Sequence, residues 1–198
     1  MAIEWEFRRH SIRDAAVNDQ MIGPLGYELA RRVGEKQLRG RKFDCFCVSS
    51  LYRTHQTLAA FVEGAGDFDL TLAPPIAPLD VVSPDTRTLW RACREAQRRG
   101  EDLVEAVFVS HARIAEKVAS QIADLFKTWS SSFADGSRIL VVGHSPALEL
   151  MLFGVTGTKI PSLNYCEGFR IIEKGGSYEV THGIDELSPT ELIKLPAE

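Results

Sequence analysis

The sequence lacks the features that mark several large classes of protein. It has only four cysteines among 198 residues, at spacings that match no zinc framework. It has no run of about 18 uninterrupted apolar residues, and its first ten residues, MAIEWEFRRH, do not resemble a signal peptide. These absences argue against a secreted disulfide scaffold and a membrane-spanning protein, and they predict a cytoplasmic location.

The chain also lacks a net positive charge. Its 23 lysines and arginines are outnumbered by 27 aspartates and glutamates, which gives a net charge of −4. Proteins that bind nucleic acids or membrane surfaces normally carry a basic field, so neither partner is expected. A composition of 44% hydrophobic and 25% charged residues is typical of a folded protein, and the length suits a single domain over residues 1–198.

The few cysteines are expected to be structural. Cys45 and Cys47 are two residues apart in an apolar run, which places them on one face of a strand. Together with Cys93 and Cys166 they should remain reduced and behave as small buried hydrophobic residues. The sequence therefore predicts neither a metal site nor a cofactor.

Strand-like and helix-like segments alternate along the chain. Short apolar runs predict strands at 3–7, 43–48, 70–72 and 138–142, and a terminal hairpin at 169–173 and 178–181. Periodic apolar residues and capping signals predict helices between Gly23 and Gly40, after Ser49 and Ser50, and at 88–98, 111–129 and 146–153. This alternation is typical of an α/β fold, a three-layer sandwich with a largely parallel central sheet flanked by helices.

Three of these strands end in polar residues of related chemistry. Arg9 and His10 follow the first strand, Arg53 lies in the segment after the second, and His144 follows RILVV at 138–142. Carboxyl ends of parallel strands meet at one edge of a sheet, where such folds bind ligands. Guanidinium groups match phosphate oxygens, and an imidazole can act as nucleophile or proton carrier. The pattern predicts an anion site that contains a nucleophile.

Four segments resemble, in order, the motifs of the histidine phosphatase superfamily, which includes the cofactor-dependent phosphoglycerate mutases. They are RRHS at 8–11, PLGYELARRVGE at 24–35, SSLYRTHQT at 49–57 and VVGHSPALE at 141–149. The resemblance implies that His10 is phosphorylated and then hydrolysed, while Arg9, Arg53 and His144 hold the phosphoryl group. To attack, His10 needs one unprotonated ring nitrogen, and a backbone carbonyl on the other nitrogen would fix that tautomer.

The implied activity is hydrolysis of a phosphate monoester, either a small molecule or a phosphoprotein. Phosphotransfer of the phosphoglycerate mutase type is the alternative. Hydrolysis is favoured because the short chain offers no obvious long lid to exclude water. Sugar phosphates, nucleotides and phosphohistidine proteins are all compatible substrates.

The chain departs from the family pattern at two places. Ser11 replaces the family's glycine and could donate its hydroxyl to the phosphate or crowd the pocket, and the general acid lacks a clear motif. Separately, Arg13 resembles a further arginine of the phytase and acid-phosphatase branch that contacts phosphate. No His-Asp pair occurs at 144–145, so the mutase-like branch is favoured. Asp80 is the first candidate for the general acid and Asp85 the second. Arg8 should point to the face opposite Arg9 and have a structural role.

Two alternatives belong to other classes. The segment GHSPA at 143–147 approximates the nucleophile elbow of α/β hydrolases, which would make Ser145 an acyl nucleophile. Its partners would be Glu173 or Glu179, followed by His182. The same phosphate pocket could also serve a non-catalytic phosphate-binding module.

Overall fold

A computed structural model describes residues 2–14, 18–66 and 83–182 of the chain. Its contacts divide the protein into two compact units. The first comprises Met1–Pro75, Asp135–Gly143 and Asn164–Glu198, and the second comprises Ile76–Ala134 and His144–Leu163. The expectation that residues 1–198 fold as one domain is not tested by this division and stays a prediction.

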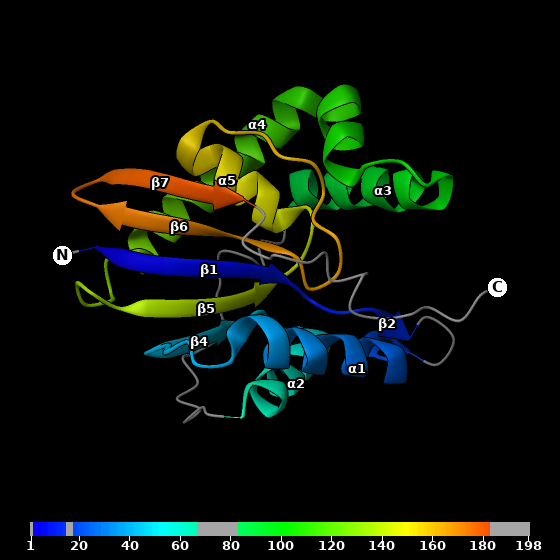
Figure 1. The fold of residues 1–198 in the computed structure, drawn as a ribbon. Helices are drawn as coiled ribbons and strands as arrows, with labels where there is room; N and C mark the ends of the chain where they lie inside the picture. Colours follow the sequence, from blue (N-terminus) through cyan, green and yellow to red (C-terminus); the bar gives the residue numbers. More distant parts are fainter. Residues whose placement is uncertain (1, 15–17, 67–82, 183–198) are drawn as a thin grey trace. The chain divides into compact units, whose positions relative to one another are not determined.

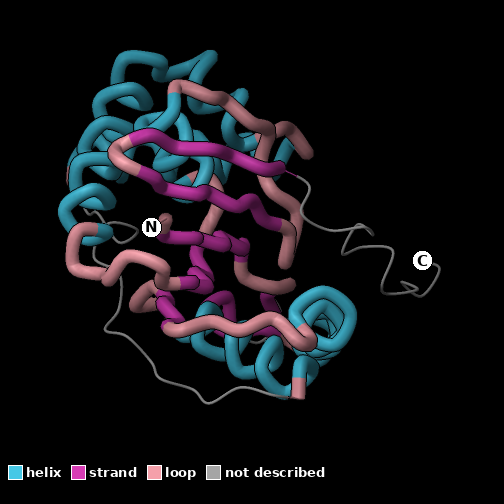
Figure 2. The backbone as a smooth tube through the Cα atoms, turned by 60° about the vertical axis from the view of Figure 1, so that its left-hand side comes forward, coloured by secondary structure: helices cyan, strands magenta, loops and turns pink. Residues whose placement is uncertain are grey.

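The first unit is built on a five-stranded mixed sheet with the order β4-β5-β1-β6-β7 (Figures 1 and 2). The strands are β1 (Ile3–Arg9), β4 (Cys45–Val48), β5 (Arg138–Gly143), β6 (Gly168–Lys174) and β7 (Ser177–His182). β4, β5 and β1 are parallel, whereas β6 pairs antiparallel with β1 and with β7. The predicted α/β class and the terminal hairpin are confirmed. Two short strands, β2 (Arg13–Asp14) and β3 (Asn18–Ile22), form a separate ladder that the sequence did not predict.

One face of this sheet is covered by α1 (Pro24–Val33), the π-helical turn η1 (Gly34–Leu38) and α2 (Tyr52–Ala65). The core between them includes Leu29, Leu58 and Phe61 from the helices and Leu140 and Val142 from β5. The predicted helix between Gly23 and Gly40 is therefore present, with a π-helical end. Ser49 and Ser50 do not cap α2, because Leu51 takes the N-cap position without a side-chain bond. The proposed strand at 70–72 lies outside the described residues.

Helices α1 and α2 approach each other so closely that a side chain is excluded at their contact. A Cβ atom built on Gly64 would lie 1.8 Å from the carbonyl oxygen of Arg31, and one on Gly34 would lie 2.1 Å from that of Phe61. Both obstacles are backbone atoms, so the helices themselves would have to move apart. Glycine at these two positions therefore permits the close packing of α2 against α1 and η1.

Gly64→Ala is accordingly expected to destabilise the protein, although alanine is the better helix former. Overpacking of this kind costs about 1–3 kcal/mol, which urea unfolding would measure. The exposed Ala59 on the same helix provides the matched control, since Ala59→Gly should cost about 1 kcal/mol from helix propensity alone. A stabilised Gly64→Ala variant would contradict the close helix contact.

The second unit contains the helices α3 (Pro84–Arg99), α4 (Leu103–Ser130) and α5 (Ala147–Thr156). A capping box between Ser83 and Thr86 starts α3, and the side chain of Asp102 caps α4. α4 begins eight residues before the predicted helix at 111–129, and its backbone is non-helical at His111.

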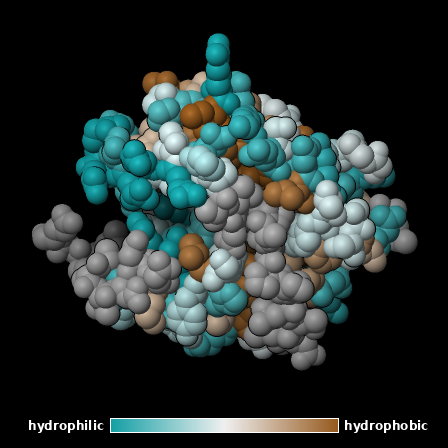
Figure 3. Space-filling model, turned by 180° about the vertical axis from the view of Figure 1, so that it is seen from behind, coloured by the Kyte–Doolittle hydropathy of each residue, from teal (hydrophilic) through white to brown (hydrophobic). Residues whose placement is uncertain are grey.

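No helix of the described residues is long and apolar enough to span a bilayer. The face drawn in Figure 3 is largely hydrophilic, with apolar residues scattered over it.

Candidate phosphate site

His10 is the first residue after β1 and lies at the carboxyl end of the parallel strands. Its backbone N–H donates to the carbonyl of Gly143, the last residue of β5, at 2.9 Å. The residue is 4% exposed. The two strands predicted to end in functional residues therefore end side by side, as the parallel register of Arg9 with Gly143 requires.

The orientation of the imidazole decides which nitrogen can react. Nδ1 of His10 lies 2.6 Å from the backbone carbonyl oxygen of Ser11. A carbonyl oxygen can only accept a hydrogen bond, so Nδ1 carries the proton and Nε2 of the neutral ring is the unprotonated nitrogen. This is the arrangement that the sequence analysis required of a histidine nucleophile.

Threonine 57 connects the end of β1 to the first turn of α2. Its hydroxyl accepts the backbone N–H of Ser11 at 3.0 Å and donates to the carbonyl of Arg53 at 2.8 Å. These two bonds connect the backbone of Arg53, the second residue of α2, to the residue that follows His10. Arg53, Arg9 and His10 all belong to the first unit. The amino end of α2, which favours an anion, is thereby connected to the segment that carries His10.

Ser11 is fully buried, and its hydroxyl donates to the carbonyl of Gly26 at 2.6 Å. A hydroxyl has one hydrogen, so this bond links β1 to α1 and leaves no donor for a phosphate. Glycine is required at position 26 because a Cβ there would lie 2.2 Å from the carbonyl oxygen of Ile12. Phosphate binding by Ser11 stays a prediction, and it requires the bond to Gly26 to be given up.

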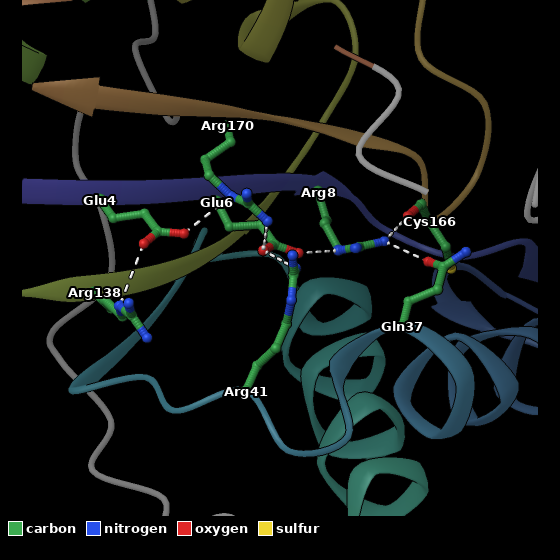
Figure 4. Close-up of polar contacts among 8 residues, drawn as sticks. All are labelled: Glu4, Glu6, Arg8, Gln37, Arg41, Arg138, Cys166 and Arg170. Carbon is green, nitrogen blue, oxygen red and sulfur yellow. Dashed lines mark hydrogen bonds and ion pairs between the residues drawn. The ribbon is translucent and has the colours of Figure 1, made fainter. Parts of the chain in front are cut away.

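A cluster of charged residues lies around β1, on the face of the sheet that α1 covers (Figure 4). Arg8 is fully buried, and its guanidinium donates to Glu6 at 2.7 Å, to Gln37 at 2.9 Å and to the carbonyl of Cys166 at 3.1 Å. Arg41 and Arg170 also pair with Glu6. The structural role expected for Arg8 agrees with these contacts, and alternation along the strand places Arg9 on the opposite face.

This cluster controls the ionisation of Glu6. Burial alone would raise the pKa of this carboxyl, but Arg8, Arg41 and Arg170 together hold its pKa below the ordinary value of 4.5. Because the folded-state pKa is depressed, the stabilisation is complete above about pH 4.5 and is lost as the pH falls through the folded-state pKa.

Glu6→Gln should therefore reduce the free energy of unfolding by about 3 kcal/mol at pH 7, since it leaves the fully buried Arg8 without its carboxylate. The difference between wild type and the variant should shrink as the pH falls below 4.5. Urea unfolding of both proteins across this pH range measures it. A difference that stays constant with pH would show that Glu6 does not act through its charge.

His144 and Ser145 begin the second unit. His144 is buried, and its carbonyl accepts from the N–H of Leu148. Ser145 does not cap α5 as predicted, because Pro146 takes the cap position and the helix starts at Ala147. Instead the hydroxyl of Ser145 donates to the buried carboxylate of Glu149 at 2.5 Å.

The serine hydrolase alternative requires an acid–base pair that the hairpin does not supply. Glu173 pairs with Tyr178, whereas His182 pairs with Phe169 four positions further along β6. At about 3.3 Å per residue this is on the order of 13 Å. Glu179 lies three residues from His182 on β7, so their side chains point to opposite faces. Neither glutamate can orient this histidine toward a serine.

The described part of the chain shows no contact that tests the roles predicted for Asp80, Asp85 and Arg13. Asp80 lies outside the described residues. Asp85 lies in the first turn of α3 and pairs with Lys117 at 2.6 Å on the surface. Arg13 is a half-buried residue of β2. The roles assigned to these three residues remain predictions.

The four cysteines form no disulfide bond with one another in the described part of the chain. Cys47, Cys93 and Cys166 are buried and Cys45 is half-buried. The contact with Cys45 and burial raise the pKa of Cys47, while burial and the nearby Glu149 raise the pKa of Cys93 to about 12. These thiols are therefore poor nucleophiles. Within residues 2–14, 18–66 and 83–182, no three histidine, cysteine or acidic side chains cluster as a metal site.

Comparison with known proteins agrees with this geometry. The sequence profile of the histidine phosphatase superfamily (branch 1) matches residues 13–169, most of the chain. The chain belongs to this superfamily. The matched region includes Arg53 and His144 but starts three residues after His10. The interpretation of His10 as the nucleophile therefore depends on its motif and its geometry. No curated protein matches the chain.

Several solved structures share the fold. Phosphoglycerate mutase from Bacillus anthracis superimposes with a TM-score of 0.66 at 14% identity, covering 93% of each chain. YhfR of Bacillus stearothermophilus has a TM-score of 0.65 at 15% identity, covering 94% of this chain and 99% of that one. Mycobacterial glucosyl-3-phosphoglycerate phosphatase has a TM-score of 0.56 at 16% identity, covering 91% and 97%. At these identities the likeness concerns the fold.

Two residues that contact the candidate site residues escaped the sequence analysis. Thr57 lies at the end of the quoted motif SSLYRTHQT, where its spacing of four from Arg53 predicts a bond to that carbonyl. Tyr165 contacts both Arg9 and His10 but lies far from them in the sequence. Nothing in the pattern around Tyr165 signals this contact.

Proposed function

We propose that the protein is a phosphatase that hydrolyses a phosphate monoester, or a phosphoprotein, through a phosphohistidine at His10. The observation that carries the proposal is the bond from Nδ1 of His10 to the carbonyl of Ser11, which leaves Nε2 as the nucleophile. Arg9 and Arg53 neutralise the phosphoryl oxygens. The motif VVGHSPALE at 141–149 assigns His144 to the same phosphoryl group.

The reaction has two balanced steps. In the first, Nε2 attacks phosphorus, a P–N bond forms, and the P–O bond to the leaving group breaks while an acid protonates the leaving oxygen. In the second, water attacks phosphorus and gives a proton to the conjugate base of that acid, the P–N bond breaks, and inorganic phosphate leaves with His10 and the acid restored. Both steps depend on in-line positioning and charge neutralisation, which two guanidinium groups and a helix amino terminus supply.

The decisive experiment compares turnover of p-nitrophenyl phosphate and p-nitrophenyl acetate by the wild type and Ser145→Ala. We expect phosphate release by both proteins, no acetate cleavage, and an acid-labile phosphoryl group on the quenched enzyme. Acetate cleavage lost in Ser145→Ala would overturn the proposal in favour of a serine hydrolase. Phosphate binding without turnover of any phosphate ester would instead identify a binding module.

Phosphoglycerate mutase activity is the second candidate, because the fold is shared with the mutase of Bacillus anthracis. Supplying 3-phosphoglycerate with 2,3-bisphosphoglycerate separates the two. A phosphatase releases inorganic phosphate, whereas a mutase forms 2-phosphoglycerate without net phosphate release.

The general acid can be identified by varying the leaving group. If Asp80 protonates the leaving oxygen, Asp80→Asn should lower kcat/KM by about 10²-fold or more for alkyl phosphates and far less for p-nitrophenyl phosphate, which needs no proton. Asp85→Asn is the direct comparison, because Asp85 is the second candidate for the acid and pairs with Lys117 on the surface. Equal losses for good and poor leaving groups would remove Asp80 from this role.

A further inference from the structure

An aromatic side chain that no motif predicts lies against both the first arginine and the candidate nucleophile. The Cζ atom of Arg9 lies 4.4 Å from the centroid of the Tyr165 ring. The same ring lies 5.9 Å from the imidazole of His10, tilted by 51°. Tyr165 is partly buried at the edge of the core formed by β4, β5, α1 and α2. It therefore contacts the two residues that face the phosphate in the proposed reaction.

The backbone around Tyr165 is held in an unusual conformation. Cys166 has a φ of +63°, the one positive φ outside glycine among the described residues. An L-residue adopts this conformation when surrounding contacts determine it. Here the N–H of Cys166 donates to the Arg9 carbonyl at 3.2 Å and its carbonyl accepts from Arg8 at 3.1 Å.

A third bond completes this attachment. The N–H of Arg9 donates to the carbonyl of Glu167 at 2.9 Å. The two residues that follow Tyr165, Cys166 and Glu167, are therefore both bonded to β1. The bond from the buried Arg8 to Cys166 thus anchors the segment to β1 (Figure 4). The anchored segment carries Tyr165, whose ring contacts Arg9. The tyrosine is placed by the same strand that places the nucleophile.

We propose that Tyr165 is a positioning residue that orients the guanidinium of Arg9 for phosphate, an inference that rests on the proposed function. A guanidinium donates its hydrogen bonds in its own plane, and an aromatic ring packs against its flat face. The ring therefore restricts the rotation of Arg9 without competing for the N–H groups that bind phosphate oxygens. The same ring also contacts the imidazole of His10.

The test separates the ring from the hydroxyl and from simple packing. Tyr165→Leu retains an apolar side chain but removes the aromatic face, whereas Tyr165→Phe retains the ring. We expect Tyr165→Leu to raise the KM for p-nitrophenyl phosphate and the inhibition constant of inorganic phosphate about 5-fold to 10-fold, with kcat changed less than about 2-fold. Tyr165→Phe should remain close to wild type.

A matched control is available at the far end of the sheet. Tyr178 pairs with Glu173, which in turn pairs with Ile3 at the start of β1, so it lies at the opposite end of the strand from Arg9. Tyr178→Leu should leave KM and phosphate inhibition unchanged. Urea unfolding of every variant establishes that the effect of Tyr165→Leu does not come from a loss of folded protein at the assay temperature.

Each outcome has a defined meaning. The inference is overturned if Tyr165→Leu binds phosphate as wild type does, if Phe and Leu variants lose affinity equally, or if the loss follows the folded fraction. If wild type binds phosphate without turning over esters, the proposed function fails, while phosphate dissociation constants of the same variants still test the role of Tyr165. If wild type neither binds phosphate nor releases it, both proposals fail.

Discussion

Replacing His10 with alanine is expected to abolish phosphatase activity while leaving the protein folded. The imidazole is the one group that bonds covalently to phosphorus in the proposed reaction, and losing such a nucleophile lowers kcat on the order of 10⁴-fold or more. The residue is small in volume and its backbone bond to Gly143 is retained by alanine. Steady-state turnover of p-nitrophenyl phosphate measures the loss, and quenched enzyme should carry no acid-labile phosphate.

His55 provides the control for this substitution. It is a partly buried histidine of α2, two residues after Arg53, and no motif assigns it a role. His55→Ala should retain most of the wild-type turnover, and both variants should unfold at similar urea concentrations. Substantial turnover by His10→Ala, or trapped phosphate that survives this substitution, would show that another group attacks phosphorus.

Arg8→Ala is expected to produce the largest loss of stability. It removes the donors to Glu6, Gln37 and the Cys166 carbonyl from a fully buried position. Breaking a buried ion pair in this way costs about 3–5 kcal/mol, since the remaining carboxylate loses a partner that replaced water. Urea unfolding of wild type and variant at pH 7 gives the difference in free energy.

Arg138 is the matched control within the same cluster. Its side chain is 57% exposed and pairs with Glu4 at 3.2 Å, so Arg138→Ala should cost less than about 1 kcal/mol. Arg8→Lys should fall between the two, because it keeps the charge but loses the fork that reaches three acceptors. Equal losses for Arg8→Ala and Arg138→Ala would show that burial does not determine the contribution of this cluster.

The fold was predictable to the extent that each segment carried its own signal. The apolar run at 138–142 and the glycines at 175 and 176 identify β5 and the terminal hairpin, since their periodicity and turn residues are local. The β2–β3 ladder was missed because its strands are short and polar. The start of α4 was placed too late because the non-helical backbone at His111 interrupts its pattern.

The candidate site shows the same division. Arg9, His10 and Arg53 could be chosen from the sequence, because each lies next to a recognisable strand or helix start. The surroundings of these residues could not be predicted, since they depend on bonds across the fold, such as Ser11 to Gly26 and Ser11 to Thr57. The hydroxyl of Ser11 was expected to face phosphate and instead bonds to α1, a contact that requires a neighbouring helix.

By itself, the sequence determined the class of fold, the order of its main strands and helices, and the chemistry of the residues that end them. These properties follow from hydrophobic periodicity and residue type, which act over a few positions. Tertiary structure alone decided the partner of the Ser11 hydroxyl, the burial of Arg8 and the placement of Tyr165 on Arg9. The physical reason is that these depend on hydrogen bonds and packing between residues up to 158 positions apart, as in the bond from Arg8 to Cys166.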